Sequence, residues 1–197
     1  MKRCFDMQII QKIRQSAGQL KFRSFERILY KCGSINEHFT AADIRAVTPE
    51  NVEDICSYEG RKNIKKYKNF LAKGNIGYYA YLDGICVHRT WIILGPGVVK
   101  SFSTYPRFRL KPNEAYIHSG ETAPSARGNN IPAAVFFKAS ADLKGRIDYF
   151  YCLVDANNTA SRRVQEKAGF AEFKRLKWFS FLWLNMFKEL EENCMSN

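Results

Sequence analysis

The stretch from Glu114 to Pro132 has the clearest chemical content of the chain. Its second half, T-A-P-S-A-R-G-N-N-I-P, is polar and rich in small residues, and a helical apolar pattern follows at once. Backbone N–H groups of such a turn, together with the positive end of a helix, can bind a pyrophosphate. Gly128 and its two Asn neighbours tolerate positive φ, and Pro132 suits a first helical turn. Taken alone, the turn also fits an ordinary strand–loop–helix connection.

A second stretch, from Val154 to Phe170, follows a predicted strand and contains the pattern N-x-x-S-x-x-V-x-E-K-x-G-F, which begins at Asn158. Together the two stretches resemble the GNAT superfamily of N-acetyltransferases. In that family, Q/R-x-x-G-x-G/A binds the pyrophosphate of acetyl-CoA, and N-x-x-A/S…Y-E-K-x-G-F forms the next helix. The resemblance covers about residues 43–180.

The resemblance implies that acetyl-CoA, or another acyl-CoA, is the cosubstrate and that no metal is needed. Arg127 matches the leading Q/R, whereas Asn130 and Pro132 stand where the family usually has glycines, and Pro132 removes one phosphate donor. The backbone of Thr122 would pair with the pantetheine arm like an added strand. The expected cofactor-binding residues are Glu121, Thr122, Ala123, Arg127, Gly128, Asn129, Asn130, Ile131, Asn158 and Ser161.

Acyl transfer to an amine requires the neutral amine, which at pH 7 costs about 4.6 kcal/mol for a pKa near 10.4. A positioned base would therefore help. Strand alternation places Glu114, Tyr116 and His118 on one face, and these are the predicted catalytic residues. His118 is preferred because its unperturbed pKa is near neutral, although a core histidine bonded to backbone fits equally. Glu114 comes second, since the family often uses an acid on this strand.

The leaving thiolate and the acceptor pocket are less well defined. Gln165 stands where many family members have a Tyr that protonates the thiolate, so another acid, water or direct thiolate departure must serve. His88 and Arg89, on the preceding predicted strand, could line the acceptor pocket or be ordinary polar positions of a sheet face.

The elements that position these residues follow from hydrophobic periodicity and turn signals. We expect strands at 43–47, 76–82, 85–93, 114–122, 146–154 and from about 170, helices from Thr48 to Gly60, at 61–73, 131–142 and 159–168, and a loop at 95–112. The order β-α-α-β-β-β-α-β-α-β indicates an α/β protein (an α+β mixed sheet) with helices on both faces. Its 114–154 segment should form a right-handed parallel crossover, as in a GNAT-like acyl-CoA N-acyltransferase fold.

The 197 residues divide into a basic amphipathic helical arm (1–40), an acyltransferase domain (41–190) and a tail (191–197). The net charge of +12 is concentrated in residues 1–31 and 61–73 and favours phosphate-bearing or acidic partners.

Nucleic acid is disfavoured as a partner, because the sequence has neither a recognition-helix motif nor a base-stacking signature. Six dispersed cysteines without a C-x-x-C pair, and no secretion signal, predict a cytoplasmic protein.

The sequence therefore predicts an N-acetyltransferase of the EC 2.3.1 class, which acts on a primary amine of a small molecule, with an amino sugar as one candidate. One alternative is longer-chain transfer from acyl-CoA or acyl carrier protein, whose acidity the basic 61–73 segment would suit. Another is a non-catalytic CoA-binding module, which Gln165 and Pro132 favour. The basic arm and the aromatic segment 178–187 allow peripheral contact with the inner membrane surface. A homodimer is compatible with the sequence.

Overall fold

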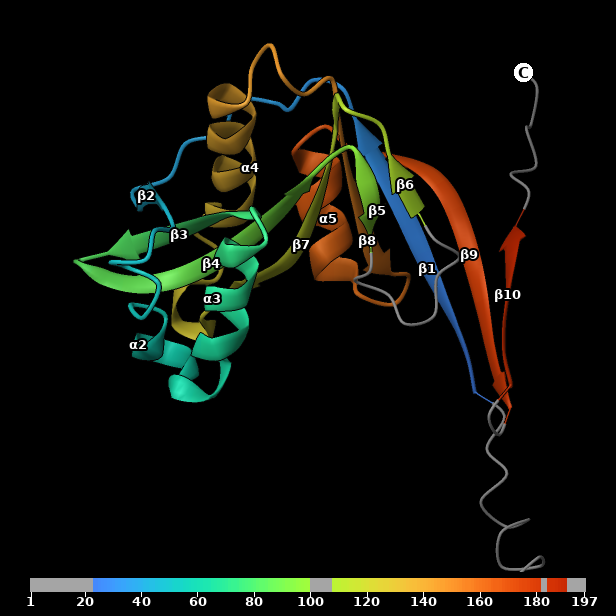
Figure 1. The fold of residues 1–197 in the computed structure, drawn as a ribbon, viewed down its shortest axis with the longest axis horizontal. Coiled ribbons are helices and arrows are strands. Elements are labelled where there is room, and N and C mark those ends of the chain that lie inside the picture. The colour runs from blue at the N-terminus through green and yellow to red at the C-terminus, as the bar shows by residue number, and fades with distance from the viewer. Residues whose placement is uncertain (1–22, 100–107, 182–183, 191–197) are drawn as a thin grey trace, which may run out of the picture.

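The computed structural model describes residues 23–99, 108–181 and 184–190, and a twisted eight-stranded sheet runs through all of them (Figure 1). The strand order is β10-β9-β1-β8-β7-β4-β3-β2. Strands β7 and β8 are parallel, and the other neighbours are antiparallel. The strands are β1 (Arg23–Cys32), β2 (Asp43–Ala46), β3 (Ile76–Leu82), β4 (Ile85–Leu94), β7 (Glu114–Thr122), β8 (Tyr149–Asp155), β9 (Ala171–Phe181) and β10 (Leu184–Leu190).

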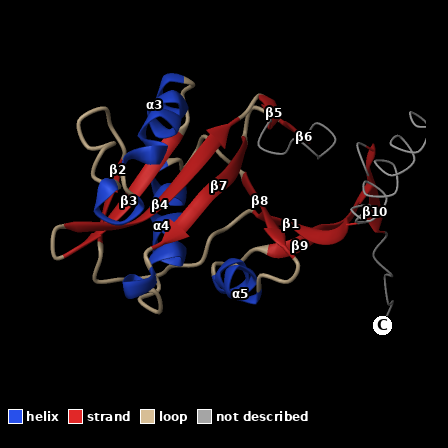
Figure 2. Cartoon of the chain, turned by 90° about the horizontal axis from the view of Figure 1, so that it is seen from below, coloured by secondary structure: helices blue, strands red, loops and turns tan. Residues whose placement is uncertain are grey.

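Helices cover both faces of this sheet, as expected (Figure 2). One face carries α2 (Cys56–Glu59), the 3-10 turn η1 (Arg61–Asn63) and α3 (Ile64–Ala72), and the opposite face carries α4 (Ile131–Asp142) and α5 (Thr159–Lys167). Each layer has its own core: Tyr67 and Trp91 are central to the first, and Ile131 and Phe136 to the second. Within the described ranges, no helix has the length and apolar character needed to cross a bilayer.

The central predictions agree with the structure, because their local signals are strong. β7 and α4 have the predicted bounds, and β7, α4 and β8 form the parallel crossover. Asp83 and Gly84 turn β3 into β4 with φ of 50° and 76°, the geometry that a tight two-residue hairpin requires. α4 is apolar on most of its surface, since it packs against the sheet and contacts α5 beside it on the same face.

The arm at 1–40 is the main incorrect prediction. Arg23–Cys32 form β1, which lies inside the sheet between β8 and β9, so the domain begins no later than residue 23. β1 buries Leu29 on one face and Ile28 and Tyr30 on the other, which removes the alternation that would have marked a strand. Residues 1–22 of the arm and the tail 191–197 lie outside the described residues.

Two further predictions need correction. Of the helix predicted from Thr48 to Gly60, only α2 is helical, because residues 49–55 form turns. Asn51 stabilises this alternative: its Oδ1 accepts the Thr48 N–H at 2.8 Å, and its Nδ2 donates to the Ala46 carbonyl at 2.9 Å. The loop at 95–112 includes a small second sheet of β5 (Gly97–Val99) and β6 (Phe108–Leu110).

Two irregularities of β7 open the sheet. Between the pairs Trp91–His118 and Arg89–Glu121, one residue of β4 faces two of β7, Ser119 and Gly120, which is a β-bulge. The ladder between β7 and β8 also ends at the pair Ile117–Cys152, although both strands continue beyond it. The carboxyl ends of two neighbouring strands are therefore unpaired with each other.

Candidate active site

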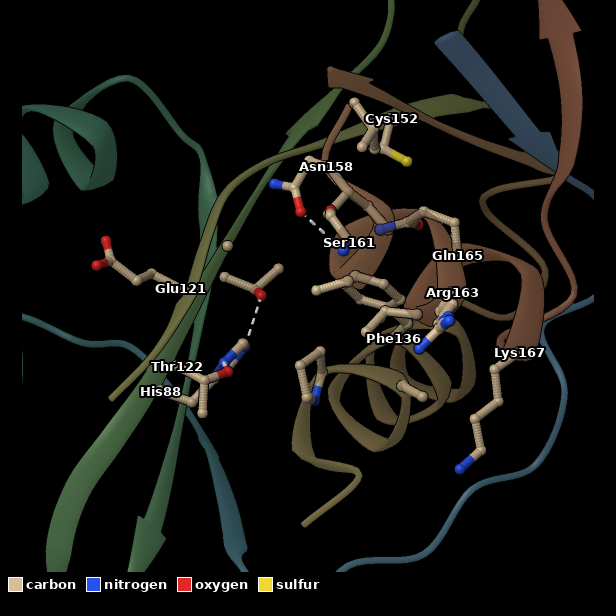
Figure 3. A pocket seen from close by; sticks show the side chains of 18 of the residues that line it. His88, Glu121, Thr122, Phe136, Cys152, Asn158, Ser161, Arg163, Gln165 and Lys167 are labelled. Atoms are coloured by element: carbon tan, nitrogen blue, oxygen red, sulfur yellow. Dashed lines mark hydrogen bonds between the residues drawn. The ribbon is translucent and has the colours of Figure 1, made fainter. Parts of the chain in front are cut away.

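A cleft of about 800 Å³ lies where β7 and β8 separate (Figure 3). Its walls come from β7 after the bulge, the turn before α4, the end of β8 and one face of α5. Predicted cofactor-binding residues that line it are Glu121, Thr122, Arg127, Gly128, Asn130, Asn158 and Ser161. Three others do not: Ala123 and Ile131 are buried in the core, and exposed Asn129 bonds to the Ala126 carbonyl.

The backbone of Thr122 faces the cleft. The Ala123 N–H donates to the Val87 carbonyl at 2.8 Å, so residue 123 directs its peptide groups toward β4. Because successive residues of a strand direct their peptide groups to opposite sides, the N–H and carbonyl of Thr122 point away from β4 toward the missing partner strand. The β7 edge can thus accept an extended ligand as an added strand.

The turn before α4 presents a row of backbone N–H groups. Gly128 has φ of +88° and Asn130 has φ of +60°, so the predicted need for positive φ is confirmed. The first helical bond is donated by Ala134 to the Asn130 carbonyl. Within the described chain, the amides of residues 128–131 and of Ala133 have no protein acceptor. Such amides at a helix N-terminus form an anion-binding cradle, even though Pro132 contributes none.

The segment between β1 and β2 braces this cradle, a role that no local pattern in the sequence indicated. Thr40 Oγ1 donates to the Asn129 carbonyl at 2.9 Å, and Asn130 Nδ2 donates to the Phe39 carbonyl at 3.2 Å. Nearby, Asn36 Nδ2 donates to the Lys167 carbonyl at 3.1 Å. One segment therefore holds the start of α4 and the end of α5 together.

Three cationic side chains, Arg127, Arg163 and Lys167, line the same end of the cleft. Each is exposed, and none has an ion pair with any residue of the described ranges. Figure 3 shows Arg163 and Lys167 side by side on α5. Unpaired cations beside free backbone amides make this end of the cleft suitable for phosphate groups.

Helix α5 contributes two carboxamides to the cleft. Asn158 caps the helix by accepting the Ser161 N–H at 3.0 Å, which leaves its Nδ2 for another partner. Gln165 is 5% exposed, and its Oε1 has no hydrogen-bond donor among the described residues. A buried carbonyl oxygen without a donor is unfavourable, so this atom is a site where a ligand N–H or O–H would be stabilised.

His118 reaches the cleft from the last position before the bulge. Its ring packs against Phe70 and Tyr116 with centroid distances of 5.0 and 6.3 Å. Asn75 Nδ2 lies 3.4 Å from Nε2, and Ser119 Oγ lies 3.1 Å from Nδ1. Burial, with smaller effects of nearby cations, lowers the pKa of His118 to about 4. The imidazole is therefore neutral at pH 7. It is a weaker base than the near-neutral pKa assumed from the sequence would make it.

The other two predicted catalytic residues do not line the cleft. The Glu114 carboxylate is buried and accepts bonds from the Lys111 N–H at 2.9 Å and the Tyr151 hydroxyl at 3.2 Å. Tyr116 belongs to an apolar cluster with Tyr151 and other residues near β5 and β6. Both share a face with His118, but they precede the point at which the strands separate, so alternation alone could not distinguish them.

Similarity to solved structures identifies the fold. No model of a known protein family and no curated protein matches the sequence. A putative GNAT-family acetyltransferase from Novosphingobium aromaticivorans matches with a TM-score of 0.55 and 18% identity, over 79% of this chain and 63% of that one. A GNAT-family acetyltransferase from Colwellia psychrerythraea matches with a TM-score of 0.56 and 19% identity, over 82% of this chain and 57% of that one. The chain has the GNAT fold.

The predicted fold class is therefore confirmed. A third structure, AAC(6')-Iy in complex with the bisubstrate analogue CoA-S-monomethyl-acetylneamine, has a TM-score of 0.50 and 16% identity, over 68% of this chain and 92% of that one. The chain spans less than two thirds of the length of the two GNAT-family acetyltransferases above.

Within this GNAT fold, His88 lies in the cleft and is not an ordinary polar position of a sheet face. Its buried ring lines the cleft, with Nδ1 2.8 Å from Thr122 Oγ1 and Nε2 2.8 Å from Thr90 Oγ1. Burial, with a smaller effect of Arg89, lowers the pKa of His88 to about 3. The pairing of His88 with Thr122 depends on the bulge, whose position the sequence does not reveal.

Proposed function

We propose that the protein is an acyl-CoA-dependent N-acyltransferase that transfers an acetyl group to a primary amine of a small molecule. One observation supports this most directly: β7 and β8 separate where the α4 amides and the Thr122 peptide face a common cleft. The same space thus offers an anion cradle at one end and an unpaired strand edge leading away from it.

The residues of the cleft fit acetyl-CoA, which would supply the acyl group as a thioester. The free amides of Gly128, Asn130 and Ala133, which line the cleft, would hold its diphosphate together with Arg127 and the two cations of α5. The Thr122 peptide would pair with the pantetheine arm, and Gln165 Oε1 could accept one of its amide N–H groups. A volume of about 800 Å³ is within the range of small-molecule sites.

Two residues are suited to the acceptor amine. The Glu121 carboxylate lines the cleft and is paired with Arg89, but its side chain is 52% exposed, so it can also accept a hydrogen bond from an ammonium group. The neutral imidazole of His118 can accept a hydrogen bond at a ring nitrogen from the amine or from water that removes its proton. Because the pKa of His118 is about 4, the imidazole does not keep a second proton at neutral pH, so the proton taken from the amine must pass on to solvent.

Calorimetry with acetyl-CoA, followed by a thiol-release assay with a panel of amines, tests the proposal. We expect saturable binding of acetyl-CoA and acceptor-dependent release of free CoA. The panel should include amino sugars and aminoglycosides, since AAC(6')-Iy is the structural neighbour solved with an acetylneamine analogue. Absence of acetyl-CoA binding would contradict the proposal. Binding with no release across a wide panel would support the non-catalytic module instead.

Acyl carrier protein is a second candidate donor, and a basic surface favours it. Lys62 of η1, Lys65 and Lys66 of α3 and the following Lys73 are all exposed on one helical segment. Carrier proteins are acidic, so this segment would attract one electrostatically. Native mass spectrometry with acyl carrier protein and with acetyl-CoA separates the two donors.

A further inference from the structure

Arg89 of β4 is a buried cation next to the bulge of β7. Its side chain is 8% exposed, and its three nitrogens donate to three different acceptors. Nε contacts the Glu59 carboxylate, Nη1 contacts the Ser119 carbonyl, and Nη2 contacts the Glu121 carboxylate. Two of these acceptors belong to the strand segment that lines the cleft.

The remaining acceptor, Glu59 of α2, is held in the helical layer by hydrogen bonds from η1 and α3. Its side chain is 7% exposed and also accepts bonds from Tyr67 Oη at 2.6 Å and Asn63 Nδ2 at 3.0 Å. Burial by itself raises the pKa of Glu59, but these bonds and the Arg89 charge lower it below its usual value. Glu59 is therefore ionised at neutral pH, and α2, η1 and α3 together form the anchor for Arg89.

The bulge needs such an anchor, because its backbone is unusual. Ser119 has φ of +51°, a left-handed conformation that non-glycine residues rarely adopt unless their surroundings enforce it. The carbonyl of that residue is the one that Arg89 contacts. Two residues later, Tyr58 Oη of α2 donates to the Glu121 carbonyl at 3.3 Å. The helical layer thus holds the bulge on both sides.

We propose that Arg89 is a positioning residue, which clamps the Ser119–Glu121 bulge to Glu59 and so directs the Thr122 peptide into the cleft. Buried ion pairs contribute little net stability on average, so stability alone does not account for this arrangement. A planar guanidinium can donate to three acceptors in one plane, whereas the ammonium of Lys cannot reproduce that geometry. The inference deepens the proposed function and rests on it for the ligand, acetyl-CoA.

Arg89→Lys keeps the charge and tests the geometry, and Arg89→Met removes both. We expect the acetyl-CoA Kd of each to rise at least about tenfold, because small displacements of binding groups are costly. Arg45→Met is the matched control: Arg45 is exposed on β2, paired with Asp43, and outside the cleft. It should bind acetyl-CoA like the wild type.

If neither Arg89 variant folds, Glu59→Gln loosens the same clamp and should raise the acetyl-CoA Kd about threefold. A folded Arg89→Lys or Glu59→Gln protein with wild-type Kd would overturn the inference.

Hydrogen–deuterium exchange supplies a readout that needs no ligand. In Arg89→Lys, peptides covering residues 117–123 should exchange at least about tenfold faster, while those covering β3 should not change. Unchanged exchange at 117–123 would overturn the inference. If the wild type fails to bind acetyl-CoA but the variant shows this local change, the clamp stands and the proposed function fails.

Discussion

Oε1 of Gln165 has no hydrogen-bond donor among the described residues. The side chain should therefore lower the stability of the folded protein but favour ligand binding. In Gln165→Leu, the free energy of unfolding should stay the same or rise by about 1 kcal/mol, because an unpaired buried oxygen is removed. The acetyl-CoA Kd should rise severalfold, because the ligand loses that acceptor. Thermal melting and calorimetry measure the two effects. A destabilised variant with unchanged Kd would show that Gln165 is only a packing residue.

Arg127 lines the anion end of the cleft and is exposed. Exposed ion pairs are worth about 0.2–1 kcal/mol, so Arg127→Ala should weaken acetyl-CoA binding by about 1.4- to fivefold. The loss should shrink as salt is added. Lys144→Ala, an equally exposed cation outside the cleft, is the control. An unaltered dissociation constant for Arg127→Ala in low salt would show that the turn has been assigned incorrectly.

His118 is the one predicted catalytic residue that lines the cleft. His118→Ala should lower kcat at least about tenfold, since general acid–base groups contribute strongly to rate, and should leave the KM for acetyl-CoA nearly unchanged. Steady-state kinetics with the best amine of the panel measures both. If kcat does not change, the role passes to Glu121 or to water, because Glu114 lies outside the cleft.

At the scale of elements, the turn into α4 should be sensitive to backbone conformation alone. A Cβ at Gly128 would contact nothing within 4 Å, but φ there is +88°. Gly128→Ala should therefore lower the free energy of unfolding by about 1 kcal/mol and weaken acetyl-CoA binding by disturbing the amide cradle. Gly97→Ala is the control, because its Cβ is equally unobstructed and its φ is not in the left-handed region. Equal unfolding midpoints in urea for the two variants would contradict this interpretation.

Elements with strong local signals could be predicted from sequence, and those defined by long-range contacts could not. β7 and α4 were predicted with their observed bounds, because a polar turn rich in small residues follows β7 and a Pro marks the first turn of α4. β1 was missed, since its partners are more than 100 residues away along the chain and both of its faces are buried. The same limit applies to the site: the positive-φ turn before α4 could be predicted. The bulge after His118 and the end of the β7–β8 ladder at Ile117, beyond which the cleft begins, depend on cross-strand register.

The molecule as a whole should lose stability in mild acid, because two buried imidazoles bind protons more weakly in the folded than in the unfolded state. Burial lowers the pKa of His118 to about 4 and that of His88 to about 3, against about 6.5 when unfolded. Their contribution is complete above pH 6.5 and declines as the pH falls toward 4, by roughly 3 kcal/mol for His118 alone. Urea unfolding at pH 7 and pH 5 measures the decline. His118→Gln should reduce it, and an identical decline in that variant would contradict the assignment.

Strand β1 also has a consequence for the order of assembly. It pairs with β8 along the edge that faces away from β7, as far as the last residue of β8. Arg27–Asp155 and Ile28–Val154 are two of these pairs. Its other edge is occupied by β9. Residues 23–32 must therefore wait for a segment synthesised more than 100 residues later before they can pair with β8 on the side away from β7. During translation, the ligand site would consequently mature only after β1 has paired with β8 and β9, and ribosome-bound chains that end before residue 171 should lack it.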